Sequence, residues 1–154
     1  MAKSYADLFS EVRERVRTIP LDALKARLDA GTPTTLVDVR EQHEFNAGFI
    51  PGAVHIPRAF LEQQAESKLP NKGAPIVVYC AAGTRSAFAA KTLSEMGYTD
   101  VTSANPGFTR WKDVRYPVET PPNLSAAQRD RYSRHLMLPE VGDVGQAKLL
   151  KSRV

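Results

Sequence analysis

The chain has 154 residues, of which 42% are hydrophobic and 25% are charged, a composition typical of one globular domain with a modest additional segment. Its net charge is +4, but six lysines and arginines against three acidic residues lie beyond residue 122, so the remainder is nearly neutral. The sequence has no dense basic stripe with interleaved aromatic residues and no long apolar run, which excludes nucleic-acid binders and membrane-spanning proteins.

The cysteine count narrows the chemistry further. One cysteine excludes an internal disulfide and a cysteine-rich zinc site, and the three histidines show no metal-ligand spacing. We therefore expect no metal and no cofactor. The first residues lack the apolar core of a secretory signal, so we expect a cytoplasmic protein.

Strands and helices are predicted to alternate along the chain. Residues 1–15 carry apolar side chains at helical spacing, which predicts an amphipathic helix packed on the domain. Strands are predicted over residues 16–19, 35–39, 52–57, 76–79 and 100–103. Helices are predicted over residues 20–28, 41–47, 60–66, 86–96 and 108–114.

This alternation predicts the fold class. It indicates a single α/β domain with a mainly parallel sheet flanked by helices, an N-terminal helix and a helical C-terminal tail. Sites in such sheets lie at the carboxyl ends of the strands, where Asp38 and Cys80 both fall. We place the N-terminal helix at 1–15, the domain at 16–117, a proline-rich linker at 118–124 and the tail at 125–154. Within the tail, helices are predicted over 126–137 and 145–151.

The segment after the most apolar strand concentrates the chemistry. Cys80 ends that strand, a short glycine-containing loop follows, and a helix begins. Loop amides that point inward and the positive end of the helix favour an anion and the thiolate, and Arg85 can add a charged donor at the rim. A lone cysteine after an apolar strand is often only a small buried residue, but the adjacent glycine and arginine favour a functional site. The candidate site comprises Cys80 with Ala81, Ala82, Gly83, Thr84, Arg85 and Ser86.

Five blocks in order resemble the rhodanese family of sulfurtransferases over about residues 16–117. They are residues 36–41 (LVDVRE), 48–57 (GFIPGAVHIP), 79–86 (YCAAGTRS), 93–98 (LSEMGY) and 106–111 (PGFTRW). The resemblance implies that Cys80 carries sulfur as a persulfide cradled by the loop amides. Thiosulfate or a persulfide-bearing protein would be the donor, and a thiophilic molecule or protein the acceptor.

The resemblance also suggests supporting residues and two departures. Asp38 and Arg40 resemble an Asp-x-Arg pair, which we expect to form an ion pair that braces the loop, with Trp111 as a further supporting residue. Phe49 stands where the family has histidine, and Phe108 where it has the second of two glycines, which predicts an altered turn near the site. We interpret the nearby His55 as a polar strand residue.

Two alternatives to a sulfurtransferase remain open. Phosphatases of the dual-specificity, cell-cycle type, and arsenate reductases, resemble this arrangement but need a different loop. Here four residues separate Cys80 from Arg85, one fewer than in the phosphatases, and the tighter ring suits one sulfur atom. The other alternative is a catalytically silent rhodanese-like module used for binding or regulation.

The tail resembles a second family. Residues 128–142 and 145–154 are similar to the first two helices of the E1-like adenylyltransferases that activate sulfur-carrier proteins in molybdopterin and thiamin synthesis. The sequence stops at Val154, before the glycine-rich nucleotide loop of that family, so we expect no ATP site and no adenylation by Arg134. The resemblance implies the sulfur-delivery part of a fusion enzyme whose acceptor is the C-terminus of a sulfur-carrier protein.

Overall fold

The computed structural model describes residues 2–121, which contain five strands, six α-helices and one 3-10 turn. The strands are β1 (Arg17–Ile19), β2 (Thr35–Asp38), β3 (Val54–His55), β4 (Ile76–Tyr79) and β5 (Val101–Ala104). The helices are α1 (Tyr5–Arg15), α2 (Leu21–Asp29), α3 (Gln42–Ala47), α4 (Leu61–Lys68), α5 (Thr84–Glu95) and α6 (Phe108–Asp113), with the 3-10 turn η1 (Arg58–Phe60) before α4.

The five strands form one parallel sheet in the order β1-β5-β4-β2-β3. Strand β4 lies in the middle, and all four of its side chains are buried. A strand covered on both faces is expected to be continuously apolar and rich in β-branched residues, which describes the sequence Ile-Val-Val-Tyr of β4. The parallel α/β fold predicted from the alternating pattern is therefore confirmed.

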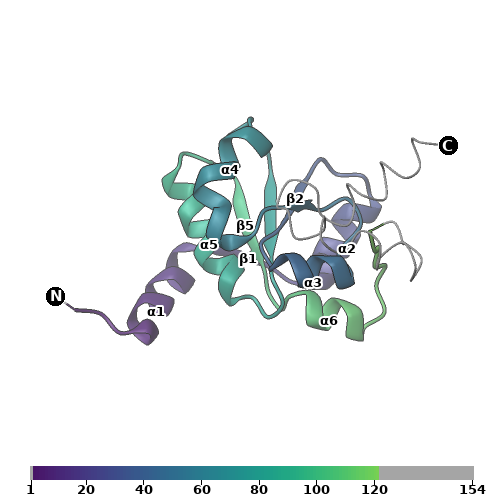
Figure 1. The fold of residues 1–154 in the computed structure, drawn as a ribbon, viewed down its shortest axis with the longest axis horizontal. Helices are drawn as coiled ribbons and strands as arrows, with labels where there is room; N and C mark the ends of the chain where they lie inside the picture. The colour runs from purple at the N-terminus through teal and green to yellow at the C-terminus, as the bar shows by residue number, and fades with distance from the viewer. Residues whose placement is uncertain (1, 122–154) are drawn as a thin grey trace, which may run out of the picture.

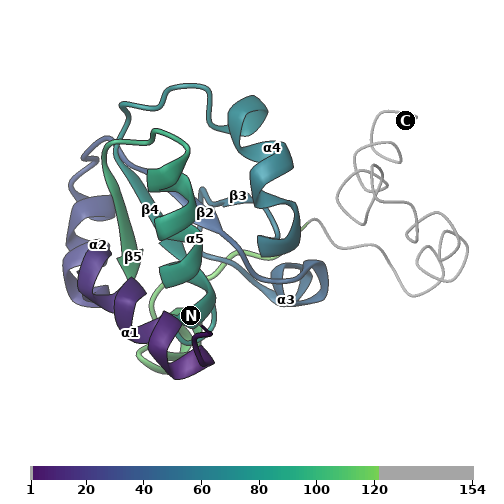
Figure 2. The ribbon, with the colours of Figure 1, turned by 90° about the vertical axis from the view of Figure 1, so that its left-hand side faces the viewer.

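Helices cover both faces of the sheet. In Figure 1, α1, α4 and α5 lie on the left of the sheet and α2, α3 and α6 on its right, and Figure 2 looks directly onto the side of α1, α4 and α5. Because side chains alternate along a strand, each face has its own core. One core joins the sheet to α4 and α5, and includes Val37, Val78, Leu61, Ala90 and Leu93; the other joins it to α2 and α6, and includes Leu24, Leu36, Val77, Phe108 and Trp111.

Several element boundaries differ from those predicted. Helix α5 begins at Thr84, two residues earlier than expected, because Gly83 adopts a left-handed conformation (φ 110°) as its N-cap and lets the helix start inside the loop. Strand β3 is only two residues long, shorter than the predicted 52–57, and β5 begins one residue later than predicted. The N-terminal helix is present as α1, and its Phe9 packs on Phe88 of α5 with ring centroids 5.9 Å apart.

Two observations concern the edges of the described region. Glu119 forms an isolated antiparallel bridge with Phe49, so the chain is still paired with the domain beyond residue 117. The helices predicted over 126–137 and 145–151, together with Arg134, lie outside the described residues. Between residues 2 and 121, none of the helices is long and apolar enough to cross a membrane.

Candidate active site

Cys80 lies immediately after β4, at the carboxyl edge of the sheet. The strand ends at Tyr79, the loop turns through Ala81, Ala82 and Gly83, and α5 starts at Thr84. The cysteine is only 1% exposed, because the loop and the first turn of α5 wrap around it. The predicted placement of Cys80 at the carboxyl end of a central strand, with Asp38 at the end of the neighbouring β2, is confirmed.

The sulfur of Cys80 receives two backbone hydrogen bonds from its own loop. The amide of Gly83 donates to Sγ at 3.1 Å and the amide of Ser86 at 3.4 Å. Gly83 is the N-cap of the 12-residue helix α5 and Ser86 lies in its first turn, so both amides are at the helix N-terminus, which carries partial positive charge. Donors and helix dipole therefore both favour negative charge at this position.

Two hydroxyl groups extend this network behind the sulfur. Sγ of Cys80 lies 3.5 Å from Oγ of Ser86, and Oγ of Ser103 lies 2.8 Å from Oγ of Ser86. Ser86 and Ser103 are 0% and 1% exposed. A chain of polar groups thus connects the loop to β5 through the interior of the domain.

The segment before α6 supports the loop from the other side. Phe108 donates its amide to the carbonyl of Cys80 at 2.8 Å, and Thr109 donates to the carbonyl of Ala81 at 3.1 Å. Gly107 makes this approach possible, since a Cβ atom there would lie 2.3 Å from the Cys80 carbonyl oxygen. The sequence resemblance predicts an altered turn at Phe108. In the structure, the close contact between this turn and the cysteine loop depends on Gly107.

Arg85 is held by an acidic residue from another element. Its two terminal nitrogens donate to the two carboxylate oxygens of Glu44 on α3, at 2.7 and 3.0 Å. Glu44 also accepts the amide of Glu41 at 3.0 Å. These hydrogen bonds, donated by Arg85 and accepted by Glu44, lower the pKa of Glu44 to about 2 and raise the pKa of Arg85. Arg85, predicted as a donor at the rim, is thus neutralised by a carboxylate beside the loop.

Asp38 and Arg40 form the ion pair that the family resemblance implied. Both Nε and Nη2 of Arg40 donate to the carboxylate, the closest contact being 2.7 Å, and both residues are buried. Arg40 also donates to the carbonyl of Gly48 at 2.6 Å, and its guanidinium lies 4.1 Å from the centre of the Phe108 ring. The pair thus connects the end of β2 to the start of α6, whose first amide supports the cysteine loop.

The remaining predicted residues lie farther from the sulfur. Phe49 stacks on Phe45 at 4.1 Å between ring centroids, and Phe45 stacks on His55 at 4.4 Å. His55, on β3 as expected, bonds the carbonyl of Arg40 through Nε2, and burial lowers its pKa. Trp111 is buried and donates to the carbonyl of Pro117 at 2.7 Å, so its side chain holds the end of the domain and not the cysteine loop.

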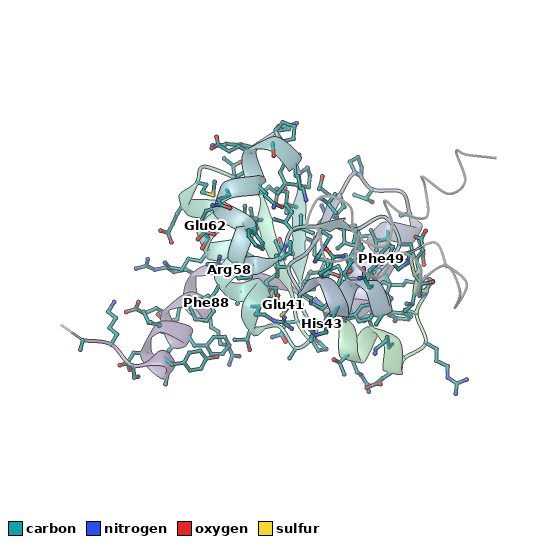
Figure 3. All side chains as sticks on the ribbon, viewed as in Figure 1. Glu41, His43, Phe49, Arg58, Glu62 and Phe88 are labelled. Atoms are coloured by element: carbon teal, nitrogen blue, oxygen red, sulfur yellow. The ribbon has the colours of Figure 1, made fainter. Side chains whose placement is uncertain are left out.

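Two pockets border the cysteine loop. One, of about 260 Å³, is lined by residues from α3, the loop and α6: Arg40, His43, Glu44, Ala47, Ala81, Phe108, Thr109 and Lys112. Figure 3 shows Glu41 and His43 at the start of α3, on the side of α6. The other pocket, of about 410 Å³, lies between α1 and the loop and is bordered by Ala82, Gly83, Thr84 and Ser103. Over residues 2–121, no cluster of three or more His, Cys, Asp or Glu side chains could hold a metal ion.

Sequence reasoning missed three residues of the site. Glu44 lies on a predicted helix that follows the Asp38 strand, and an acidic residue at that edge was a signal for a partner of Arg85. Ser103 is a polar residue on the same face of β5 as the buried Val101, and a hydroxyl at such a position suggests a buried hydrogen bond. Gly107 lies in the block at residues 106–111 and precedes Phe108, which stands in place of the family's second glycine, but the pattern did not indicate that Gly107 contacts the cysteine loop.

Comparisons with known proteins agree with this geometry. YrkF of Bacillus subtilis is 34% identical over 102 residues, which are 66% of this chain and 54% of YrkF, so the chain spans just over half of that relative. The thiosulfate sulfurtransferase GlpE of Pseudomonas putida is 36% identical over 68% of this chain and 90% of GlpE. Among solved structures, RPA3614 of Rhodopseudomonas palustris, described as a possible tyrosine phosphatase, has a TM-score of 0.71 at 29% identity, over 77% of this chain and 96% of its own.

A family match covers the whole site. Residues 20–114 match the Rhodanese-like domain family, a range that includes the sheet from β2 to β5, the cysteine loop and α6. This range is more than half of the chain, and it agrees with the alignment to nearly the full length of GlpE. The chain belongs to the rhodanese-like family of sulfurtransferases.

Proposed function

We propose that this chain transfers sulfane sulfur by carrying it as a persulfide on Cys80. The observation that carries the proposal is the pair of amide donors, from Gly83 and Ser86, at 3.1 and 3.4 Å from the sulfur. Such donors stabilise a thiolate, and further amides of the same loop are available to a second sulfur atom bonded to Sγ. The loop is short and its first two side chains are methyl groups, which leaves room for a small anion.

The chemistry consists of two displacements at sulfur. The Cys80 thiolate attacks the outer sulfur of thiosulfate, a new S–S bond forms, and the bond to the central sulfur breaks as sulfite leaves with the electron pair. A nucleophilic acceptor then attacks the terminal sulfur of the persulfide, and the Cys80 thiolate is regenerated as the leaving group. Negative charge stays in the loop during both steps. The loop amides can stabilise it throughout, and Arg85, which is paired with Glu44, is not needed as a free cation.

The first test detects the persulfide by the increase in the intact mass of the chain. The purified chain is incubated with thiosulfate, its intact mass is measured, and cyanide is then added. We expect a gain of one sulfur atom that cyanide removes as thiocyanate, and no gain in Cys80→Ser. An unchanged mass with thiosulfate and also with a small persulfide donor would refute the sulfurtransferase proposal and leave the silent binding module.

The geometry disfavours the phosphatase alternative that the relative from Rhodopseudomonas palustris raises. Phosphate transfer needs an arginine free to bind the phosphoryl group and an acid to protonate the leaving group. Arg85 is engaged by Glu44, and the lowered pKa of Glu44 keeps that carboxyl ionised. We expect no Cys80-dependent hydrolysis of an aryl phosphate, whereas turnover lost in Cys80→Ser would favour a phosphatase.

We propose that the acceptor is the C-terminus of a sulfur-carrier protein. In a fusion of this domain to an adenylyltransferase, one domain would adenylate that C-terminus and this one would deliver the sulfur to it. The support is the sequence resemblance of residues 125–154 to the start of such enzymes. The test uses the chain loaded with radioactive sulfur and a carrier protein whose C-terminus has been adenylated. Transfer of label to the carrier is expected, and label that stays on Cys80 while cyanide still removes it would rule out this acceptor.

A further inference from the structure

Ser103 is a buried hydroxyl in a place where packing alone calls for an apolar side chain. It lies on β5, opposite Val78 of β4, and points to the face of the sheet covered by α5. Val78 and Val101 of the same face are buried among apolar residues. Because a buried hydroxyl without a hydrogen bond is destabilising, its partner explains its presence. That partner is Oγ of Ser86, at 2.8 Å.

The direction of this hydrogen bond matters for the cysteine. When Ser103 donates to Ser86, one of the two lone pairs of the Ser86 oxygen is occupied, and the Ser86 hydroxyl proton remains available to another acceptor. The Cys80 thiol, 3.5 Å from the same oxygen, donates to Ser86; once the thiol is ionised, its sulfur becomes an acceptor to which the Ser86 hydroxyl can donate. A hydroxyl that both accepts and donates is a stronger donor than an isolated one, since consecutive hydrogen bonds polarise one another.

We propose that Ser103 is a positioning residue for the sulfur chemistry: by donating to Ser86, it directs the Ser86 hydroxyl onto the Cys80 thiolate. The Cys80 thiol loses its proton to solvent, and the Ser86 hydroxyl then rotates so that it donates a hydrogen bond to the sulfur. Ser103, on β5, donates the hydrogen bond that holds Ser86 in this orientation. This inference deepens the proposed function, because the thiolate is the form that attacks the sulfur donor.

Charged groups beside the cysteine loop stay unchanged in the test. They are Arg85 and its partner Glu44, from α5 and α3, and Arg40 with its partner Asp38, from the end of β2. His43 borders the pocket beside Ala81, together with Lys112 of α6. The side chain of Ser103 bonds Ser86 and none of these groups, so substitution of that serine leaves both ion pairs in place.

The test measures ionisation of the thiol without any sulfur donor. The rate of Cys80 alkylation by iodoacetamide is followed as a function of pH in Ser103→Ala, Ser103→Val and Ser103→Thr. Valine and threonine have nearly the same shape, so the comparison isolates the hydroxyl from packing. The matched control is Ser94→Ala, which removes a hydroxyl of α5, the helix that carries Ser86, where Ser94 donates to the carbonyl of Ala90.

We expect the pH of half-maximal alkylation to rise by roughly 0.5 to 1 in Ser103→Ala and Ser103→Val, and to stay near wild type in Ser103→Thr and Ser94→Ala. Equal profiles in the threonine and valine variants would overturn the inference, as would a wild-type profile in a folded Ser103→Ala protein. The result is separate from the persulfide test. A shifted profile without persulfide formation would reject the proposed function and keep the role of Ser103 in ionisation.

Discussion

Replacing Gly107 by alanine tests how closely α6 must approach the cysteine loop. The backbone of Gly107 is extended (φ −103°, ψ −153°), a conformation that any residue can adopt, so conformational strain is not the issue. The obstacle is space, because the new Cβ would lie 2.3 Å from the carbonyl oxygen of Cys80 and 2.6 Å from that of Ala81.

The size of the effect follows from these distances. Contacts of a Cβ below 3.0 Å are essentially never seen, so the Cys80 carbonyl and Gly107 must separate by at least 0.7 Å, the difference between 2.3 and 3.0 Å. That movement weakens the hydrogen bonds from Phe108 and Thr109 to the loop, each contributing about 1 kcal/mol. We expect a loss of about 1–3 kcal/mol in the free energy of unfolding. A displacement of this order at a reacting group lowers the rate roughly a hundredfold.

The assay compares Gly107→Ala with Gly73→Ala, at a turn where a Cβ would meet nothing closer than Asn71 at 3.5 Å. Unfolding in urea gives the free energy, and sulfur transfer from thiosulfate to cyanide gives the rate. Gly73→Ala should match the wild type in both. A Gly107→Ala protein with unchanged midpoint and rate would show that the loop tolerates the displacement, and would refute this account of its support.

Two further predictions concern the ion pairs. Asp38→Asn leaves the charge of Arg40 buried without its partner, so urea unfolding should show that the free energy of unfolding falls by about 3–5 kcal/mol. The control Asp29→Asn, which breaks a surface pair with Lys25, should lower it by less than about 1 kcal/mol. Equal losses in the two variants would contradict the buried-pair argument. Glu44 has a folded pKa of about 2, below its ordinary 4.5, so its contribution to stability is complete above pH 4.5 and is lost as the pH falls toward 2. The stability gap between wild type and Glu44→Gln should therefore shrink from pH 6 to pH 3, and a gap independent of pH would exclude the pair with Arg85 as its source.

Much of the fold could be predicted because its signals are local. The apolar β-branched run of β4, with turn residues on both sides, is unambiguous as a buried strand. Parallel strands bring their carboxyl ends to one edge, so the positions of Asp38 and Cys80 followed from the pattern alone. The start of α5 was misplaced because a glycine can continue a loop or cap a helix, and its φ is not written in the sequence.

The contacts of the site were harder to predict because they depend on tertiary packing. Arg85 and Glu44 are 41 residues apart, and nothing local to either residue names the other. The sequence therefore assigns the guanidinium of Arg85 to an anion bound at the loop, whereas in the structure it is paired with the carboxylate of Glu44. Ser103 and Gly107 act on the loop across the sheet and across the turn into α6, and periodicity carries no information about such approaches.

The strand order has a consequence for assembly of the domain during synthesis. Within residues 2–121, strand β1 pairs with β5 alone, and Arg17 lies opposite Thr102. The first strand therefore has no neighbour until most of the domain has been made. The cysteine loop is also incomplete until Ser103, Phe108 and Thr109 have left the ribosome and closed around it. Contacts this distant in sequence carry a large loop-closure entropy and slow the search for the native state. The full set of contacts around Cys80 therefore forms late, only after α6 has been made.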